Sequence, residues 1–320
     1  MRQILFLLVI NLILVGCASS PQVPVNVSEE YRDDTLSQWT YRRHNLQFPH
    51  GIAIDKEDNI YIADTNNHRI CKFNKNGDII MKLGSMGTET GKFKFPYGVG
   101  VDSVGNIYVA DTNNYRIQKF DRDGNFLLTF GQPGFEEGEF DRPYSIYVDK
   151  NDNVYVVDTY NHRIQKFTST GNFTIQIGSA GTGEGQFRYP SGVDVDSLSN
   201  IYVVDMGNNR IQKFSPTGLY LHKWGKFGSS EDGDFNQPQG ICSDASDDIF
   251  VLDTDNHRIQ KFSPFGSFIL KFGKFGSADG EFNQPTGIAR NSAGNLYVVD
   301  TYNHRIQKFT STGSFILTIQ

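Results

Sequence analysis

The sequence has few of the residues that cross-link small domains or hold structural metals. Its 320 residues include three cysteines, Cys17, Cys71 and Cys242, and none stands in a Cys-x-x-Cys pair, which excludes a zinc framework and a RING domain. The apolar run Ile4–Val15 has 12 residues, fewer than the roughly 20 that a membrane-spanning helix needs. No segment behind it keeps a 3.6-residue apolar period. We therefore expect stability to come from packing rather than from cross-links.

The N-terminus has the features of an export signal. Met1-Arg2 and the apolar run Ile4–Val15 have the charge and the length of a signal peptide. The following Leu14-Val15-Gly16-Cys17 resembles the cleavage box of prokaryotic lipoproteins. This resemblance implies removal of residues 1–16 and attachment of a diacylglyceryl (palmitate-type) lipid to Cys17. A buried cysteine behind an ordinary signal peptide is the alternative.

Residues 17–48 are expected to form a lipid-anchored tether and a segment that covers a seam of the fold. Ala18–Glu30 contains Ser, Pro and Val without a regular period, as flexible tethers do. We expect the protein outside the cytoplasm, anchored by its lipid to a prokaryotic membrane. Ala18 and Ser19, with no Asp after Cys17, favour the outer membrane where the cell has one.

A ten-residue motif, Asp-Thr-x-Asn-x-Arg-Ile-x-Lys-Phe, occurs six times with small variations. Its first residue is Asp64, Asp111, Asp158, Asp205, Asp253 and Asp300, so the steps are 47, 47, 47, 48 and 47 residues. A fixed period of this size indicates a repeat architecture, in which each unit buries its apolar face against its neighbours.

Each repeat encodes four short strands. In the third copy, residues 145–149, 153–158, 163–167 and 172–177 alternate in polarity or are rich in Val, Ile, Phe and Tyr, and turn-forming residues separate them. Four antiparallel strands in each of six units are typical of a β-propeller, whose ring protects the sheet edges. The sequence therefore predicts an all-β fold, a six-bladed β-propeller over residues 49–320.

The repeat also resembles a known family. The run Asp300–Phe309, preceded by Gln284–Ile288, is similar to the NHL repeat, and similar copies extend from about Pro49 to Gln320. The resemblance implies a six-bladed propeller. Kelch and tryptophan-aspartate propellers fit worse, because neither their glycine doublets nor a Gly-His…Trp-Asp signature occurs.

Residues that recur in all six copies are interpreted as framework, because one ligand rarely needs six equivalent groups. The Asp and Arg of the motif, such as Asp64 and Arg69, are expected to bridge within the turn or to a neighbouring blade. The repeated aromatic residues, such as Tyr61, Phe73 and Phe93, are expected in the blade cores.

Residues that depart from the repeat form the predicted binding site. The long connections between blades, such as Gly131–Pro143, share one face with the motif turns, and binding residues concentrate on loops that a rigid scaffold holds. A Pro-x-Gly step opens each first strand, with Ser145 in place of the glycine in the third copy. Its variable residue is expected at the mouth of the central channel on this face. The six variable residues are His50, Tyr97, Tyr144, Ser191, Gln239 and Thr286.

Two further sets complete the predicted site. Within the first strands, Tyr147 and Asp194 replace small residues, and Arg290 replaces an aliphatic one. Asp194 and Arg290 either hold an ion or a carboxylate, or each pairs with a local polar neighbour. At the motif turns, the variable residues Tyr160, Asp255 and Tyr302 give an aromatic rim of mixed polarity, as protein interfaces favour.

The leading functional hypothesis is a non-enzymatic recognition module. It would act as a monomer without a cofactor and bind a protein, peptide or glycan on the long-loop face; the fold alone supports nothing narrower. Nucleic acid is not an expected partner. The five long loops hold eleven Asp or Glu and six Lys or Arg, and the chain carries a net charge of −6, which repels phosphate.

The alternative is a propeller lyase or lactonase with a metal-assisted site at the channel. At the level of the propeller the chain resembles peptidylglycine amidating lyases, and this resemblance implies zinc-binding histidines at Pro-His steps. Only His50 matches, and one imidazole cannot complete a catalytic zinc site. A calcium or zinc ion in the channel, with Asp194 as a calcium ligand or acid–base group, belongs to this alternative.

Overall fold

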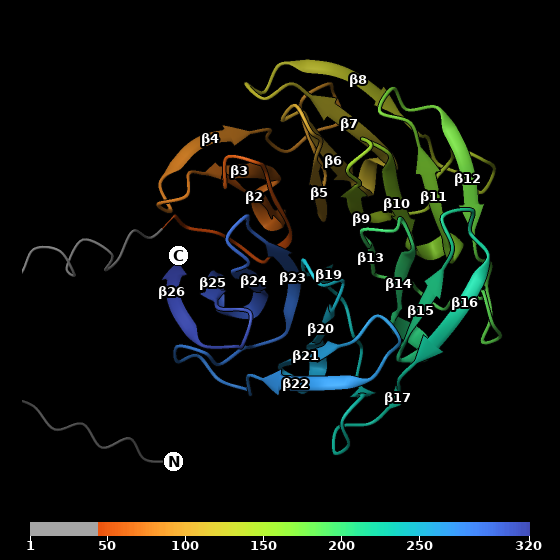
Figure 1. Cartoon of the computed structure of the whole chain (residues 1–320). Coiled ribbons are helices and arrows are strands. Elements are labelled where there is room, and N and C mark those ends of the chain that lie inside the picture. Colours follow the sequence, from red (N-terminus) through yellow and green to blue (C-terminus); the bar gives the residue numbers. More distant parts are fainter. Residues whose placement is uncertain (1–43) are drawn as a thin grey trace, which may run out of the picture. The chain divides into compact units, whose positions relative to one another are not determined.

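The structure is a computed structural model that describes residues 44–320. The predicted signal peptide 1–16, Cys17 and the tether up to residue 43 lie outside the described residues. From residue 44 on, six four-stranded sheets are arranged around a central axis (Figure 1), and each is built from four consecutive antiparallel strands. The prediction of a six-bladed β-propeller is confirmed. No helix in this part of the chain is long and apolar enough to span a membrane.

The two inner strands of each blade carry most of the apolar sequence. The first strands, nearest the axis, are β1 (Pro49–Ile54), β5 (Gly98–Val101), β9 (Pro143–Val148), β13 (Gly192–Val195), β19 (Ile241–Ser243) and β23 (Pro285–Arg290). The second strands are β2 (Ile60–Asp64), β6 (Ile107–Asp111), β10 (Val154–Asp158), β14 (Ile201–Asp205), β20 (Ile249–Asp253) and β24 (Leu296–Asp300). The second strands are buried on both faces, which explains their continuous apolar runs.

The two outer strands complete each blade. The third strands are β3 (Arg69–Phe73), β7 (Arg116–Phe120), β11 (Arg163–Phe167), β15 (Arg210–Phe214), β21 (Arg258–Phe262) and β25 (Arg305–Phe309). The outermost strands are β4 (Ile79–Leu83), β8 (Phe126–Phe130), β12 (Phe173–Ile177), β16 (Tyr220–Trp224), β22 (Phe268–Phe272) and β26 (Phe315–Ile319).

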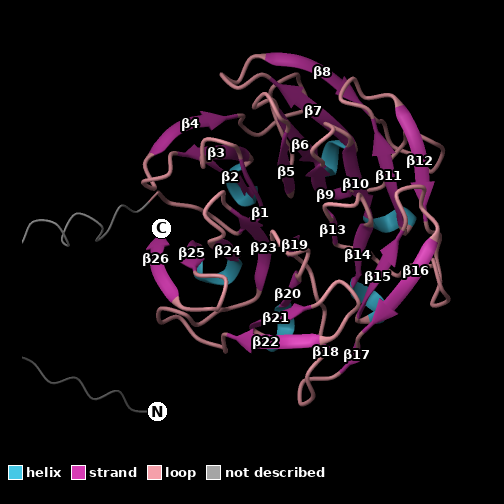
Figure 2. Cartoon of the chain, viewed as in Figure 1, coloured by secondary structure: helices cyan, strands magenta, loops and turns pink. Residues whose placement is uncertain are grey.

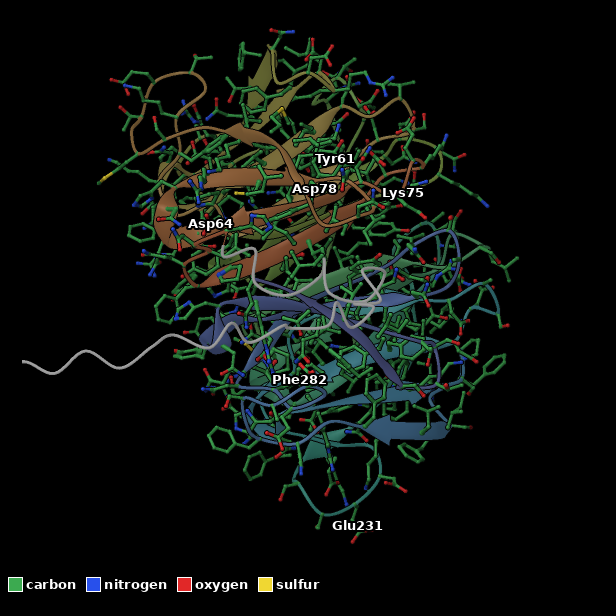
Figure 3. All side chains as sticks on the ribbon, turned by 90° about the vertical axis from the view of Figure 1, so that its left-hand side faces the viewer. Tyr61, Asp64, Lys75, Asp78, Glu231 and Phe282 are labelled. Carbon is green, nitrogen blue, oxygen red and sulfur yellow. The ribbon has the colours of Figure 1, made fainter. Side chains whose placement is uncertain are left out.

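Short 3-10 turns join the second and third strands (Figure 2). They are η2 (Thr65–Asn67), η3 (Thr112–Asn114), η4 (Thr159–Asn161), η5 (Met206–Asn208), η6 (Thr254–Asn256) and η7 (Thr301–Asn303). The 48-residue step of the repeat contains the loop between β16 and β19. Within this loop β17 (Lys226–Phe227) and β18 (Asp234–Phe235) pair in parallel, and Glu231 lies at its projecting tip (Figure 3).

The ring closes between the last and first blades without exchanging a strand. Leu46 is 4% exposed and packs with Ile306 and Ile319 of the last blade. Counting the repeat back from Phe93 by 47 residues reaches Leu46, so Leu46 occupies the place of the repeated phenylalanine. The backbone N–H of His44 also donates to the carbonyl of Gln320. Residues 44–48 therefore cover the seam.

Six apolar clusters between neighbouring blades form the core. In the cluster between blades 1 and 2, Tyr61, Phe93 and Phe120 pack together and are at most 1% exposed. Phe282 occupies the equivalent place between blades 5 and 6 (Figure 3). Burying one such ring fully stabilises the fold by roughly 1.5–3 kcal/mol. The aromatic residues that recur in the repeats are therefore core residues, as their recurrence predicts.

Each motif aspartate is the centre of a buried polar network. All six are fully buried, and each accepts a hydrogen bond from Nε of the arginine five residues later, at 2.6–2.8 Å. In blade 3, Asp158 also accepts from Asn161 at 2.9 Å and from the backbone N–H of Asp141 at 2.8 Å. Burial raises the pKa of Asp158 although these donors oppose it. The carboxylate therefore depends on all of its partners.

The same network holds the long loop that enters each blade. Nη2 of Arg163 donates to the carbonyls of Glu136 and Glu139 at 2.7 and 2.9 Å. Gln165 donates to the carbonyl of Glu139 at 2.7 Å and accepts from the backbone N–H of Gly138 at 2.9 Å. The repeated polar residues thus fix the loops that form one face of the propeller.

Replacing Asp158 with Ala should destabilise the propeller strongly. The change leaves the buried guanidinium of Arg163 without its carboxylate, and breaking a buried pair in this way costs about 3–5 kcal/mol. Urea or thermal unfolding measures the loss, and Asp123→Ala, in an exposed turn, is the control. Equal stability of the two variants would contradict the framework role of the motif aspartate.

Candidate functional site

Two repeated contacts fix the mouth of the central channel. In five of the six blades the threonine of the 3-10 turn donates to the carbonyl of the proline that opens the next blade, as Thr65 does to Pro96 at 2.8 Å. The glycine two residues after the proline allows close approach: a Cβ on Gly51 would lie 2.4 Å from the carbonyl oxygen of Tyr97. The residue between proline and glycine is therefore held at the mouth.

Three of the predicted mouth residues form an aromatic cluster. The rings of His50 and Tyr97 meet edge to face with centroids 4.4 Å apart. The rings of Tyr97 and Tyr144 stack at 4.7 Å with 28° between their planes. The Tyr144 hydroxyl then crosses to blade 5 and donates to Oε1 of Gln239 at 2.9 Å. Side chains from four blades thus meet over the channel.

The remaining two mouth residues hold the backbone of the opening. The Ser191 hydroxyl lies 3.1 Å from the carbonyl oxygen of Pro238 and 3.2 Å from that of Gln239. The hydroxyl of Thr286 lies 2.6 Å from that of Thr301. The structure thus brings the six predicted mouth residues to one opening.

A small cavity lies within this opening. Its volume is about 70 Å³, and its lining includes His50, Tyr97, Tyr144, Ser191 and Thr286 together with backbone of the first strands. Such a space takes a few water molecules or one small chemical group. It is too small for the body of a drug-sized ligand. A larger ligand would therefore lie across the mouth on the long-loop face.

His50 is the titratable group of the mouth. Burial lowers the pKa of His50 to about 4, so the ring is neutral at neutral pH. Its Nδ1 lies 2.9 Å from the carbonyl oxygen of Phe48, which can only accept, so Nδ1 carries the hydrogen and Nε2 is an acceptor. Within residues 44–320 no group donates to Nε2. This nitrogen is available to a hydrogen-bond donor or to a proton.

The predicted rim residues lie on the same face with partners of their own. Tyr160 and Tyr302 are 45% and 50% exposed. The Arg142 guanidinium lies 4.5 Å from the centroid of the Tyr160 ring. Asp255 accepts a hydrogen bond from Nε2 of Gln284 at 3.1 Å. The rim therefore presents aromatic rings, and Arg142 and Asp255 each have a partner.

Three aromatic rim residues, Phe48, Phe95 and Tyr189, were not predicted from the sequence. Each stands directly before a mouth proline in the left-handed backbone region, with φ of 45°, 48° and 46°. Phe95 contacts His68 at 4.5 Å between centroids, in a turn that carries Asn66 instead of a tyrosine. The Tyr189 ring centroid lies 5.5 Å from Tyr160 and 4.7 Å from His162. The Phe48 centroid lies 5.2 Å from Tyr302 and 4.6 Å from His304. We call the two sets the aromatic triads: Tyr160, Tyr189 and His162, and Tyr302, Phe48 and His304.

The predicted residues of the first strands lie deeper and between blades. Asp194 is 3% exposed and accepts the backbone N–H of Ser243 at 2.8 Å, and burial raises the pKa of Asp194 to about 7. Nε of Arg290 donates to the carbonyl of the same Ser243 at 3.2 Å, and the Tyr147 hydroxyl lies 3.4 Å from the carbonyl of Val195. These are pairings with local polar neighbours.

Among the side chains of residues 44–320, no three His, Cys, Asp or Glu residues lie close enough together to hold a metal ion. At the mouth, His50 is the one group of these types among the residues that line the cavity.

Comparisons with known proteins agree with the fold. The NHL repeat model matches residues 46–73, 93–120, 235–262 and 282–309, and a model described as a 6-bladed beta-propeller matches residues 136–224. No curated protein is significantly similar to the chain in sequence.

Solved structures show the same architecture at low sequence identity. Virginiamycin B lyase from Staphylococcus aureus has 18% identity and a TM-score of 0.59, over 84% of this chain and 83% of the lyase. A gluconolactonase from Xanthomonas campestris has 13% identity and a TM-score of 0.59, over 80% and 84%. A Bacteroides thetaiotaomicron protein of unknown function has 17% identity and a TM-score of 0.61, over 83% and 70%. These likenesses show the fold alone.

The neutral state of His50 predicts a pH-dependent stability. Its pKa in the folded state, about 4, lies below its ordinary value of 6.5, so the unfolded chain takes up the proton first as pH falls. Between pH 6.5 and 4 the free energy of unfolding should therefore fall by up to about 3 kcal/mol more in the wild type than in His50→Gln. Urea unfolding of both proteins at pH 7.5 and 4.5 measures this. A difference between them that does not change with pH would contradict the assignment.

Proposed function

Because the chain is a six-bladed propeller that carries NHL repeats, we propose that it is a recognition module that binds its ligand across the channel mouth. One observation carries the proposal: residues that vary between repeats meet at a single opening of an otherwise repeated framework. His50, Tyr97 and Tyr144 come from three blades and are in contact. Aromatic rings with polar edges provide apolar area and hydrogen bonds together, as recognition surfaces require.

The size of the cavity and the charge of the loops support this function. An opening of about 70 Å³ can receive one anchoring group while the rest of the ligand lies on the rim. Eleven acidic and six basic residues in the five long loops disfavour nucleic acid. We also propose that the protein acts as a monomer.

We propose that the propeller works outside the cytoplasm on a lipid anchor. The sequence Leu14-Val15-Gly16-Cys17 supports lipidation at Cys17, and residues 17–43 give a connection between anchor and propeller. A rigid disc held close to a membrane would present its long-loop face to ligands of the cell envelope.

An enzyme is the second candidate, and His50 is the observation that favours it. The His50 imidazole is neutral and its Nδ1 is held by a backbone carbonyl, so the Nε2 lone pair can accept a hydrogen bond from a substrate or bind a metal ion. Its lowered pKa makes it a weak general base at neutral pH. A histidine-to-alanine variant of virginiamycin B lyase is described as catalytically inactive, which gives this candidate a parallel on the same fold. Metal analysis of the purified protein tests it: a stoichiometric metal lost in His50→Ala would favour a lyase or lactonase.

Replacing Tyr97 and Tyr144 with Ala should abolish ligand capture while the fold persists. Both side chains are half-buried at the mouth, so the unfolding temperature should fall by less than about 5 °C. Capture from a cell-envelope extract by the immobilised full-length protein measures binding, and Leu198→Ala, in an exposed turn between first and second strands, is the control. Undiminished capture by the double variant would refute the mouth as the binding site.

Replacing Cys17 with Ser should release the protein from the membrane. The change removes the thiol that the lipid requires and leaves the propeller intact. Metabolic labelling with palmitate and fractionation of membranes measure the effect, with Cys242→Ser as a control for general loss of a thiol. Label on the Cys17→Ser protein would exclude lipidation at this residue.

A further inference from the structure

The two aromatic triads stand on opposite sides of the channel mouth. Their turns belong to blades 3 and 6, three blades apart in a ring of six, and Asp158–Gly171 and Asp300–Gly313 are identical in sequence. Thr159 and Thr301 tie these turns to the mouth prolines of the next blades, both at 2.8 Å. The other four turns carry Asn66, Asn113, Gly207 and Asp255 in place of the tyrosine. The face therefore has two matched aromatic platforms around one opening.

Both platforms are accessible and reach the mouth. Tyr160, Tyr189 and Tyr302 are 45%, 40% and 50% exposed. The Arg142 guanidinium lies 4.5 Å from the centroid of the Tyr160 ring, so a ligand would meet the part of this ring that Arg142 leaves exposed. The Tyr302 ring contacts Phe48, which directly precedes Pro49 and the mouth residue His50. The Tyr160 ring contacts Tyr189, which directly precedes Pro190 and the mouth residue Ser191. Each platform is therefore adjacent in the chain to a mouth residue.

The mouth side chains His50, Tyr97, Tyr144 and Gln239 carry no net charge, and the nearby cation Arg142 lies against the Tyr160 ring. Nε2 of His50 is a pure acceptor, and within residues 44–320 neither it nor the Tyr97 hydroxyl has a hydrogen-bond partner. The Gln239 side-chain oxygen accepts a hydrogen bond from Tyr144. The amide N–H groups of Gln239 remain available to donate to other acceptors. The mouth therefore offers one acceptor, one hydroxyl and one amide donor to a ligand that lies across it.

We propose that the mouth and the two aromatic triads bind a linear neutral oligosaccharide, an inference that rests on the recognition function proposed above. A sugar ring has a face of C–H groups, which packs on an aromatic ring, and a rim of hydroxyl groups, which both donate and accept. Sugar rings would stack on Tyr160 and Tyr302, while hydroxyl groups between them pair with His50, Tyr97 and Gln239. A linear chain can place one sugar ring on each triad and present hydroxyl groups to the mouth between them.

Other ligand classes match this chemistry less well. A proline-rich peptide also packs on aromatic rings, but proline has no N–H to donate to Nε2 of His50. An anionic polysaccharide would meet the acidic long loops and be repelled. Neutral hydroxyl-rich chains satisfy both the rings and the unpaired acceptor.

Calorimetric titration of the full-length protein in detergent tests the proposal. The probes are cellohexaose, chitohexaose and xylohexaose, with decaproline as the competing ligand class. We expect saturable binding of at least one of the three hexasaccharides. Tyr160→Ala and Tyr302→Ala should each weaken binding by about tenfold. Phe265→Ala, an exposed ring in a turn between third and fourth strands, should leave the affinity unchanged.

Three results would overturn the oligosaccharide proposal: no binding of any of the three hexasaccharides, binding that both tyrosine variants retain in full, or binding of decaproline through the same tyrosines. The recognition function fails separately. Where sugars do not bind but envelope capture still requires Tyr97 and Tyr144, recognition stands and the ligand class is wrong. Loss of both would remove the recognition function itself.

Discussion

The buried carboxylate at the end of each second strand is the interaction on which the rest of the structure depends. Asp158 has no access to water, so its charge is tolerable only while its donors stay in place. Those donors come from the turn, from the third strand through Arg163 and from the entering loop through the backbone of Asp141. One residue therefore fixes the turn, the strand register and the loop together, and six copies of it fix one whole face of the ring.

A rigid face allows a few positions to vary without loss of the fold. The proline carbonyl and the close approach of the glycine hold the residue between them at the channel mouth, whatever its side chain is. His50, Tyr97 and Tyr144 use this freedom to form an aromatic cluster. The motif turns vary in the same way: Tyr160 and Tyr302 stand at a position that Asn, Gly or Asp occupies in the other four blades. The proposed binding residues thus stand at positions where other, repeated residues hold the backbone in place.

Much of the architecture was predictable because the period of the motif and the alternation within one repeat are local properties of the sequence. The mouth was predictable too, since a Pro-x-Gly step marks it in five of the six blades. Phe48 and Tyr189 were not, because a residue before proline usually avoids the backbone region that these two occupy. The setting of Asp194 and Arg290 was also hidden, because it depends on which neighbouring blade each side chain of a first strand faces. Leu46 was missed as a core residue because it stands where the other blades have phenylalanine.

The central claim is that repeated residues build the ring, while the exposed rim tyrosines that depart from the repeat add little to its stability. The most direct test is the free energy of unfolding of the double variant Tyr160→Asn, Tyr302→Asn, which gives blades 3 and 6 the Thr-Asn-Asn turn of blades 1 and 2. The account predicts a value within about 1 kcal/mol of the wild type, as for surface substitutions. A loss of about 3 kcal/mol or more would show that these tyrosines belong to the framework and would contradict the account.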